Sequence, residues 1–154
     1  MVLQLKFAAR LDAGLSLAML LVRHLQIEGF GGAERLLPVP LHPRRLRNRG
    51  FNQAREIALV VSQQSGIPIL ANAVRRTRNT AAQSSLGNRR DRADNIRGVF
   101  EVQRGAGLSG RRIALIDDVV TTGVTASGLA AAVLAAGARD VQVWACARAA
   151  ESSV

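Results

Sequence analysis

The chain has 154 residues, of which 48% are hydrophobic, so it is long and apolar enough for one domain with a sizeable core, and it is not a disordered segment. One cysteine and two histidines exclude a disulfide framework and a cysteine-rich zinc site. The net charge is +10, and the low aromatic content of 3% argues against an aromatic platform that stacks the bases of a single strand.

The basic residues are almost all arginine, because Lys6 is the one lysine of the chain. Two explanations fit this bias: arginine recognises phosphate in a bidentate manner, and a mutational bias toward arginine codons gives the same excess. A strongly basic chain also binds nucleic acid without sequence preference. The longest apolar run, residues 13–22, is too short to span a membrane, so we expect no membrane segment, no signal peptide and a cytoplasmic protein.

The first predicted element is a packing helix within residues 1–27, with Asp12 as its N-cap. Its apolar face has residues at helical spacing: Leu15, Ala18, Met19, Val22 and Leu25. Residues 36–41 then predict a short strand, whose prolines prevent a full ladder of hydrogen bonds. The arginine-rich run of residues 44–53 is either a solvated face or an anion-binding loop, and its place between a strand and a helix favours the anion-binding loop.

A second helix is predicted over residues 52–64, and Gly66 ends it. Its buried face consists of Ala54, Ile57, Ala58 and Val61. Short extended segments are predicted at residues 67–70, 74–75 and 99–102. Between the last two lies a long polar stretch, residues 77–97, which is either a functional lid or a basic excursion without a role.

Three glycines at positions 105, 107 and 110 match the spacing of a dinucleotide-binding fingerprint. That fingerprint must open a helix, whereas this stretch runs straight into an apolar strand. We therefore interpret residues 105–110 as a glycine turn. The cysteine, Cys146, falls in an apolar run and is interpreted as an inert core residue.

The strongest pattern is a strand–loop–helix–strand unit near the C-terminus. Four apolar residues, 113–116, predict a strand that is buried on both faces, as in a parallel sheet. A helical pattern that ends at Gly137 and a second apolar run, residues 141–147, complete the unit. Ligands of such units bind at the carboxyl ends of the strands, so the loop of residues 117–125 is the candidate site.

This loop combines acids, hydroxyls and a glycine just before a helix. A helix N-terminus attracts phosphate, and Gly123 lets the backbone approach it closely. The hydroxyl donors are Thr121, Thr122 and Thr125. Asp117 and Asp118 would repel a phosphate, but they accept hydrogen bonds from sugar hydroxyls or hold a divalent cation. The loop therefore indicates a phosphorylated sugar with vicinal hydroxyls; a P-loop fits poorly because no lysine follows Gly123, and an ordinary capped turn is the plain alternative.

The loop resembles the phosphoribosyl pyrophosphate (PRPP) signature of type I phosphoribosyltransferases, in which an apolar strand, two acids and two apolar residues precede Thr-Thr-Gly-x-Thr. The resemblance implies that the acids hold the ribose hydroxyls and that the loop holds the 5′-phosphate. The residues to which it gives these roles are Asp117, Asp118, Val119, Val120, Thr121, Thr122, Gly123, Val124 and Thr125. It also implies an α/β fold with a twisted, mainly parallel sheet flanked by helices, as a single domain over residues 1–154.

Over nearly its full length the chain resembles one branch of that superfamily, the ComF/GntX proteins. The matching stretches are residues 5–7, 38–42, 49–53, 76–80 and 98–100, with Gln83, Leu86, Arg89, Asn95 and the PRPP loop. The resemblance implies a pyrophosphate-binding loop whose candidate residues are Leu41, His42, Arg44, Arg45 and Arg47. It implies a flexible hood at residues 77–92, from which Arg89 and Arg90 close on the site. ComF proteins usually carry an N-terminal zinc module before the point where this chain starts, so we expect no zinc here.

Two hypotheses of function follow from the resemblance. The first is an enzyme that binds PRPP with Mg²⁺, uses Asp117, Asp118, Arg89 and Arg90 as catalytic residues, and transfers the phosphoribosyl group to a nitrogen acceptor. Asp117 and Asp118 are the candidate Mg²⁺ ligands. The second is a non-catalytic module that senses PRPP or a nucleotide and assists DNA uptake or binds single-stranded DNA. Expected partners are PRPP or another phosphorylated ribose, DNA-uptake proteins and a second copy of the chain, with no membrane.

Overall fold

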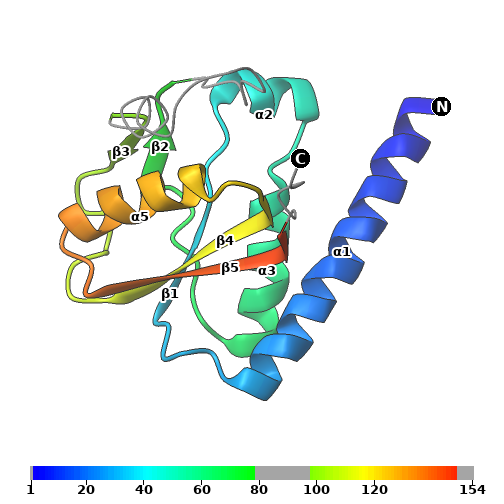
Figure 1. Cartoon of the computed structure of the whole chain (residues 1–154). Helices are drawn as coiled ribbons and strands as arrows, with labels where there is room; N and C mark the ends of the chain where they lie inside the picture. The colour runs from blue at the N-terminus through cyan, green and yellow to red at the C-terminus, as the bar shows by residue number, and fades with distance from the viewer. Residues whose placement is uncertain (1, 79–97, 149–154) are drawn as a thin grey trace, which may run out of the picture.

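The computed structural model describes residues 2–78 and 98–148, and only the backbone of residues 2–13. The helices and strands of this part are α1 (Val2–Glu28), β1 (Arg35–Pro38), α2 (Pro43–Arg49), α3 (Gln53–Ser65), β2 (Val74–Arg76), β3 (Phe100–Val102), β4 (Arg112–Val120), α5 (Val124–Ala135) and β5 (Asp140–Arg148). Figure 1 shows the sheet between α5 on one face and α3 with α1 on the other. The α/β fold predicted from the sequence is confirmed.

A three-stranded parallel sheet in the order β1–β4–β5 forms the centre of the molecule. Leu36 of β1 lies opposite Ala114 of β4, and Ile116 of β4 lies opposite Trp144 of β5. Ile69 makes an isolated parallel bridge to Leu36, so the chain beyond α3 extends the sheet past β1. The short strands β2 and β3 form a separate antiparallel pair. The main sheet is therefore parallel, as the uninterrupted apolar run of β4 predicted.

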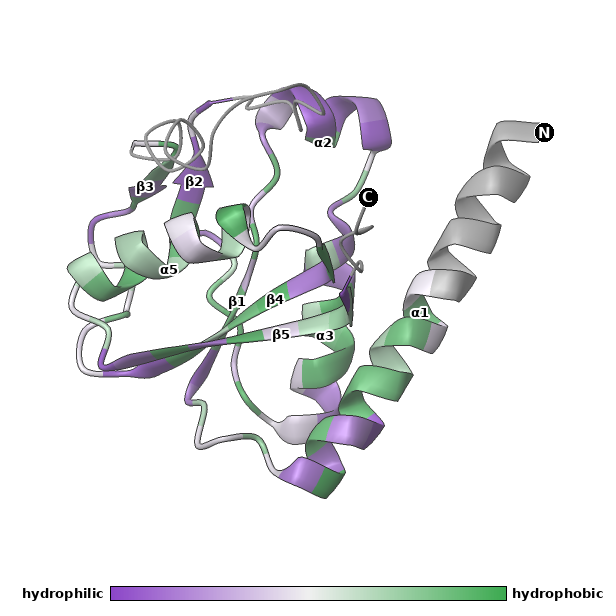
Figure 2. Cartoon of the chain, in the orientation of Figure 1, coloured by the Kyte–Doolittle hydropathy of each residue, from purple (hydrophilic) through white to green (hydrophobic). Residues whose placement is uncertain are grey.

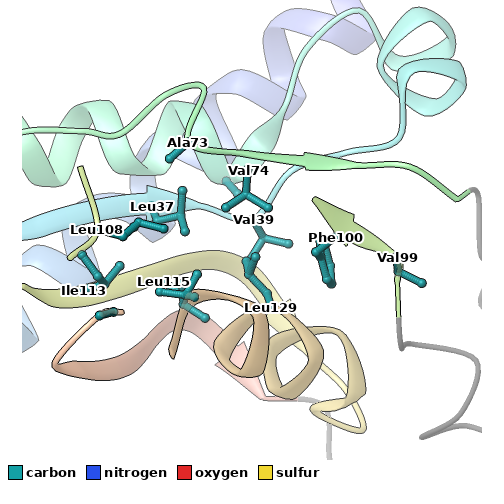
Figure 3. Close-up of a cluster of buried hydrophobic side chains, with 13 residues drawn as sticks. Leu37, Val39, Ala73, Val74, Val99, Phe100, Leu108, Ile113, Leu115 and Leu129 are labelled. Atoms are coloured by element: carbon teal, nitrogen blue, oxygen red, sulfur yellow. The ribbon is translucent and has the colours of Figure 1, made fainter. Parts of the chain in front are cut away.

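The side chains of β4 alternate between two apolar cores, one on each face of the sheet. Ile113 and Leu115 pack with α5 and with the β2–β3 pair, in the cluster drawn in Figure 3. Ala114 and Ile116 pack on the opposite face with residues of α1 and α3. All four side chains are fully buried. Because successive residues of a strand point to opposite faces, β4 is held from both sides, and its carboxyl end has a fixed position.

Helix α3 begins and ends where the sequence predicted. The Oδ1 atom of Asn52 accepts a hydrogen bond from the backbone N–H of Ala54 at 3.1 Å, and Gly66 ends the helix with a φ of 74°. The four residues predicted to face the core are buried: Ala54, Ile57, Ala58 and Val61. The Nδ2 atom of Asn52 also donates to the carbonyl of Val39 at 3.1 Å, which ties the start of α3 to the chain just after β1.

Helix α1 differs from its prediction in two ways. It spans Val2–Glu28, so Asp12 lies inside the helix and is not its N-cap. Leu15 and Met19 are 53% and 48% exposed rather than buried. The core residues on α1 are Ala18, Leu21, Val22 and Leu25. The prediction is confirmed for Ala18, Val22 and Leu25 and was wrong for Leu15 and Met19. Apolar residues surround the helix, including the exposed Leu20 and Ile27, so spacing alone did not single out the whole buried side. Within residues 2–78 and 98–148, no helix has the length and apolar character needed to cross a membrane.

A short helix, α2, occupies the arginine run where a loop was predicted. The Nδ1 atom of His42 accepts a hydrogen bond from the backbone N–H of Arg44 at 3.2 Å, and Pro43 is the first helical residue. Gly50 ends the helix with a φ of 81°. Proline suits the first position of a helix and glycine the position after its end, so these two residues explain why the run is helical. Figure 2 shows that α2 is strongly hydrophilic.

Strand β4, helix α5 and strand β5 form the predicted strand–loop–helix–strand unit. Residues 105–110 form a turn that leads into β4 and open no helix, which confirms the glycine-turn interpretation. Gly137 follows the last residues of α5 with a φ of 94°. Strand β4 is longer than predicted, because it continues through Asp117 and Asp118 to Val120. The two acids are therefore held in a strand rather than in a free loop.

Candidate functional site

A cavity of about 310 Å³ lies at the carboxyl ends of β1 and β4, where parallel α/β sheets bind their ligands. Its walls come from the chain just after β1, α2, the start of α3, β2, the end of β4 and the start of α5. The lining residues are Val39, Leu41, Arg45, Arg49, Asn52, Gln53, Ala54, Arg76, Asp117, Asp118, Val119, Val120, Thr121, Gly123, Val124, Thr125 and Ala126. The cavity thus joins segments from both halves of the chain.

The β4–α5 junction supplies one wall of this cavity. Asp117 is paired with Ala145 of β5, and the pairing continues through Val119 and Val120, so the acids stand near the carboxyl end of β4. Gly123 precedes α5 in the left-handed conformation, with a φ of 75°, and gives the helix no side-chain cap. A Cβ atom at this position would meet nothing within 4 Å, so the turn is open on this side. An uncapped N-terminus of a 12-residue helix directs its backbone N–H groups and partial positive charge toward the cavity.

The two acids differ in their surroundings. The pKa of Asp117 is raised to about 7, chiefly by burial and next by the neighbouring Asp118, although the backbone N–H of Asp118 and the charge of Arg76 lower it. The backbone N–H of Asp118 donates to Oδ1 of Asp117 at 2.9 Å, and the backbone N–H of Val119 donates to Oδ1 of Asp118, also at 2.9 Å. A carboxyl group in a cavity with a pKa near neutrality is a candidate for binding and for proton transfer.

Arginines from α2 and β2 form another part of the cavity wall. Among the residues that the structure describes, the lining cations are Arg45, Arg49 and Arg76. An Nη atom of Arg49 donates a hydrogen bond to Oε1 of Gln53 at 2.5 Å. This bond links the last residue of α2 to the first residue of α3. Arg76 is half-buried, and its pKa is lowered by burial and by the charge of Arg45. This wall is suited to an anion.

The structure brings most of the sequence-predicted site residues together. Those that line the cavity are Leu41, Arg45, Asp117, Asp118, Val119, Val120, Thr121, Gly123, Val124 and Thr125. Those that are not among its lining residues are His42, Arg44, Arg47 and Thr122. His42 caps α2 instead, and the helical turn of α2 directs Arg44 and Arg47 away from Arg45. Arg89 and Arg90 lie outside the described residues.

Four polar lining residues were not named as candidates from the sequence: Arg49, Asn52, Gln53 and Arg76. The first three lie in the run of residues 44–53 that was predicted to bind an anion, whereas Arg76 lies outside it. Arg49 stands four residues after Arg45, so the two arginines share one face if residues 43–49 are helical. A helix predicted over this run would therefore have indicated Arg49. Asn52 and Gln53 follow from the capping pattern at the start of α3. Arg76 had no sequence signal of its own, because it reaches the cavity through the pairing of β2 with β3.

The described part of the cavity offers Mg²⁺ only some of the oxygen ligands that the ion needs. In the described part of the chain, no group of three or more His, Cys, Asp or Glu side chains is placed to hold a metal ion. Asp117 and Asp118 supply two carboxylates, whereas Mg²⁺ requires six oxygen ligands and takes the others from water and from substrate phosphates. The two acids therefore fit Mg²⁺ that arrives with a phosphorylated ligand.

Curated relatives of the chain are concerned with competence and DNA use. The chain is 37% identical over 117 residues to Competence protein F of Haemophilus influenzae. The matched region covers 75% of this chain and 51% of that protein. It is 36% identical over 145 residues to the DNA utilization protein YhgH of Escherichia coli K12. Here the matched region covers 92% of this chain and 63% of that protein. The chain therefore spans about half to two-thirds of the length of these relatives. No family model matches it.

Two solved structures with the same fold are similar to most of this chain. One is the allosteric regulatory enzyme of purine biosynthesis, with a TM-score of 0.54. Another is the glutamine PRPP amidotransferase from B. subtilis complexed with ADP and GMP, with a TM-score of 0.56. Each is 21% identical to this chain and covers 85% of it, while the chain covers 25% and 26% of those proteins. At this identity the likeness concerns the fold alone.

Proposed function

Because the chain belongs to the ComF family and has the type I phosphoribosyltransferase fold, we propose that its cavity binds a phosphorylated ribose, and that PRPP together with Mg²⁺ is the ligand. The observation that carries this proposal is the order of groups around the cavity. The uncapped start of α5 lies beside two acids at the end of β4, and arginines stand across from them. A sugar phosphate with a second anionic group matches this order.

In the proposed complex, each part of the ligand has its own partners. The backbone N–H groups at the start of α5 and the hydroxyls of Thr121 and Thr125 bind the 5′-phosphate. Asp117 and Asp118 accept hydrogen bonds from the ribose hydroxyls. Arg45 and the other lining arginines bind the pyrophosphate, for which the planar guanidinium is suited. Mg²⁺, when bound with the ligand, supplies positive charge to the pyrophosphate.

We further propose that the protein transfers the phosphoribosyl group. The bond between C1 of the ribose and the pyrophosphate oxygen breaks, a new bond forms between C1 and a nitrogen of the acceptor, and that nitrogen loses its proton. The leaving pyrophosphate gains negative charge, which cavity arginines, with Arg89 and Arg90, stabilise. A raised pKa makes Asp117 the candidate to hold the released proton.

A second candidate function is a module without turnover that binds PRPP or a nucleotide and assists DNA uptake. The names of the relatives, a competence protein and a DNA utilization protein, favour it. Exposed arginines on α2, Arg44 and Arg47, add positive charge beside the cavity and would contact the phosphates of single-stranded DNA. A cytoplasmic homodimer is part of either proposal, since a second copy would cover the exposed Leu20 and Ile27 of α1.

Calorimetry and a turnover assay test these proposals. Titration with PRPP is expected to show binding that requires Mg²⁺ and is lost in Asp117→Asn, and an absence of PRPP binding to the wild-type protein would refute the ligand. Release of pyrophosphate in the presence of a panel of nitrogen bases supports the enzyme. Binding of PRPP without pyrophosphate release, together with oligonucleotide binding that weakens steeply with salt and is unchanged in Asp117→Asn, supports the module.

A further inference from the structure

Arg76 enters the cavity from a part of the chain that is remote from the other lining arginines. It is the last residue of β2, and Phe100 is its partner across the β2–β3 pair. The guanidinium carbon of Arg76 lies 5.7 Å from the centre of the Phe100 ring, within the range of a cation–π contact. The hydroxyl of Thr77, the next residue, donates to the carbonyls of Gly98 and Val99 at 2.9 and 3.1 Å, so the strand pair is closed just beyond Arg76.

The electrostatic environment of Arg76 points to an anion. A half-buried guanidinium loses part of its hydration, and the charge of Arg45 acts on it through space in the unfavourable direction. Asp117, which lines the same cavity, is the acid whose charge acts favourably on Arg76. Two cations that face one cavity from α2 and β2 are therefore stabilised when a ligand places an anion between them.

The position of Arg76 decides which anionic group it meets. The N-terminus of α5 and its threonines offer donors to one phosphate on one side of the two acids. Arg76 and Arg45 act on each other and lie on the side of α2 and β2. A ligand with a phosphate at α5 and hydroxyls at the acids thus extends its second anionic group toward this pair of arginines.

We propose that Arg76 binds the pyrophosphate group of the ligand together with Arg45, and that Phe100 is a positioning residue that holds the Arg76 guanidinium toward the cavity. This inference rests on the proposed function, because it assigns a role within the same site. The face of the Phe100 ring fixes the plane of the guanidinium, so that two parallel N–H groups are presented to one phosphate. Phe100 is buried in the apolar core of α5, which gives the ring a fixed position (Figure 3).

Neighbouring Arg75 offers a matched control. It stands on the same strand as Arg76, is exposed, and is not among the cavity-lining residues. Both Arg75→Met and Arg76→Met remove one positive charge from the same strand and keep a long apolar side chain. A difference between the two variants therefore reports the position of the charge and not the net charge of the protein.

Calorimetry with three probes tests Arg76: PRPP with Mg²⁺, inorganic pyrophosphate with Mg²⁺, and ribose 5-phosphate. Arg76→Met is expected to weaken binding of PRPP and of pyrophosphate by about tenfold or more, and to leave the affinity for ribose 5-phosphate within about twofold. Arg75→Met is expected to leave all three affinities within about twofold. Arg76→Lys, which keeps the charge without the bidentate geometry, is expected to fall between the wild-type protein and Arg76→Met. Circular dichroism melts establish that each variant is folded.

Phe100 is tested through its effect on the affinities for PRPP and pyrophosphate relative to the affinity for ribose 5-phosphate. Phe100→Leu keeps an apolar side chain but removes the ring face, and is expected to weaken PRPP and pyrophosphate binding by about two- to fivefold without changing ribose 5-phosphate binding. Phe100→Tyr keeps the ring and is expected to restore wild-type affinity for all probes. An effect of Phe100→Leu on stability alone would leave these affinities unchanged and would overturn the positioning role.

The outcomes separate this inference from the proposed function. If the wild-type protein binds none of the three probes, the proposed function and the inference both fail. If it binds PRPP and Arg76→Met binds PRPP equally well, the inference alone fails. An equal loss for ribose 5-phosphate and for pyrophosphate also overturns it, because Arg76 would then act only by neutralising Asp117.

Discussion

The backbone N–H of Asp118 donates a hydrogen bond to Oδ1 of Asp117 at 2.9 Å, so the peptide between the two acids orients the first carboxyl group. The same bond favours the charged form of Asp117, yet burial and the second acid outweigh it and raise the pKa to about 7. Near neutral pH, Asp117 is therefore present in both its protonated and its ionised form, and we expect ligand binding at the site to depend on pH.

Binding of ribose 5-phosphate is expected to strengthen as the pH rises from 6 to 8. Only the ionised carboxylate of Asp117 accepts hydrogen bonds at both oxygens, so below its pKa of about 7 the association constant changes by up to about tenfold per pH unit. The measurement is calorimetry at several pH values. The ligand phosphate titrates near pH 6 as well, so methyl phosphate, which has no ribose hydroxyls, is the control ligand, and equal pH slopes for both ligands would contradict the prediction.

The stability of the free protein is expected to have a matching pH dependence of opposite sense. The folded pKa of Asp117 lies above its ordinary value of 3.8, so the folded state binds this proton more tightly than the unfolded state. Its contribution to the free energy of unfolding is therefore lost as the pH rises from about 4 through about 7. Asp117→Asn is expected to be more stable than the wild-type protein by on the order of 1 kcal/mol at pH 8, with a smaller difference at pH 4.5. Urea unfolding at both pH values measures this, and an equal difference at both would refute it.

Asn52 is expected to support both α3 and the chain after β1. Asn52→Ala removes the cap on the Ala54 N–H and the bond to the Val39 carbonyl, and is expected to lower the free energy of unfolding by about 1–2 kcal/mol. Asn52→Asp keeps the oxygen that caps the helix but loses the donor to Val39, and is expected to lose roughly half as much. Thermal and urea unfolding provide the comparison, and equal losses in the two variants would show that the cap contributes nothing.

Gly123 is expected to matter more for the ligand than for the fold. Gly123→Ala strains a residue with a φ of 75° and is expected to lower the free energy of unfolding by roughly 1 kcal/mol. It also shifts the N–H groups at the start of α5, which is expected to weaken PRPP binding by about tenfold. Gly66→Ala is the matched control, since Gly66 has a φ of 74°, has open space around a Cβ atom and is not among the cavity-lining residues. A loss of affinity in Gly66→Ala as large as that in Gly123→Ala would contradict this role.

The elements that the sequence predicted correctly are those in which local signals and burial agree. Asn52 and Gly66 mark the ends of α3, and the helical spacing between them coincides with its buried face. The apolar run of residues 113–116 has no polar break, which is what a strand between two cores requires. In both cases the local preference of the chain and its tertiary environment favour the same structure.

The arginines of the site show where such reasoning stops. In a loop, Arg44, Arg45 and Arg47 were equivalent, but in a helix that starts at Pro43 only one of the three lines the cavity. Arg76 reaches the same cavity through an antiparallel pair whose strands are separated by more than twenty residues of sequence. No local pattern encodes that pairing, so the residue could not be assigned to the site before the fold was known.

Trp144 lies on β5 opposite Ile116, one position before the partner of Asp117, and its ring is 6.1 Å from that of Phe30. The chain has no tyrosine and no second tryptophan. Its intrinsic fluorescence therefore comes from a single indole on the strand beside the one that carries the acids. The protein holds its own optical probe of that region, and ligand binding or unfolding there is observable without a dye or an introduced label.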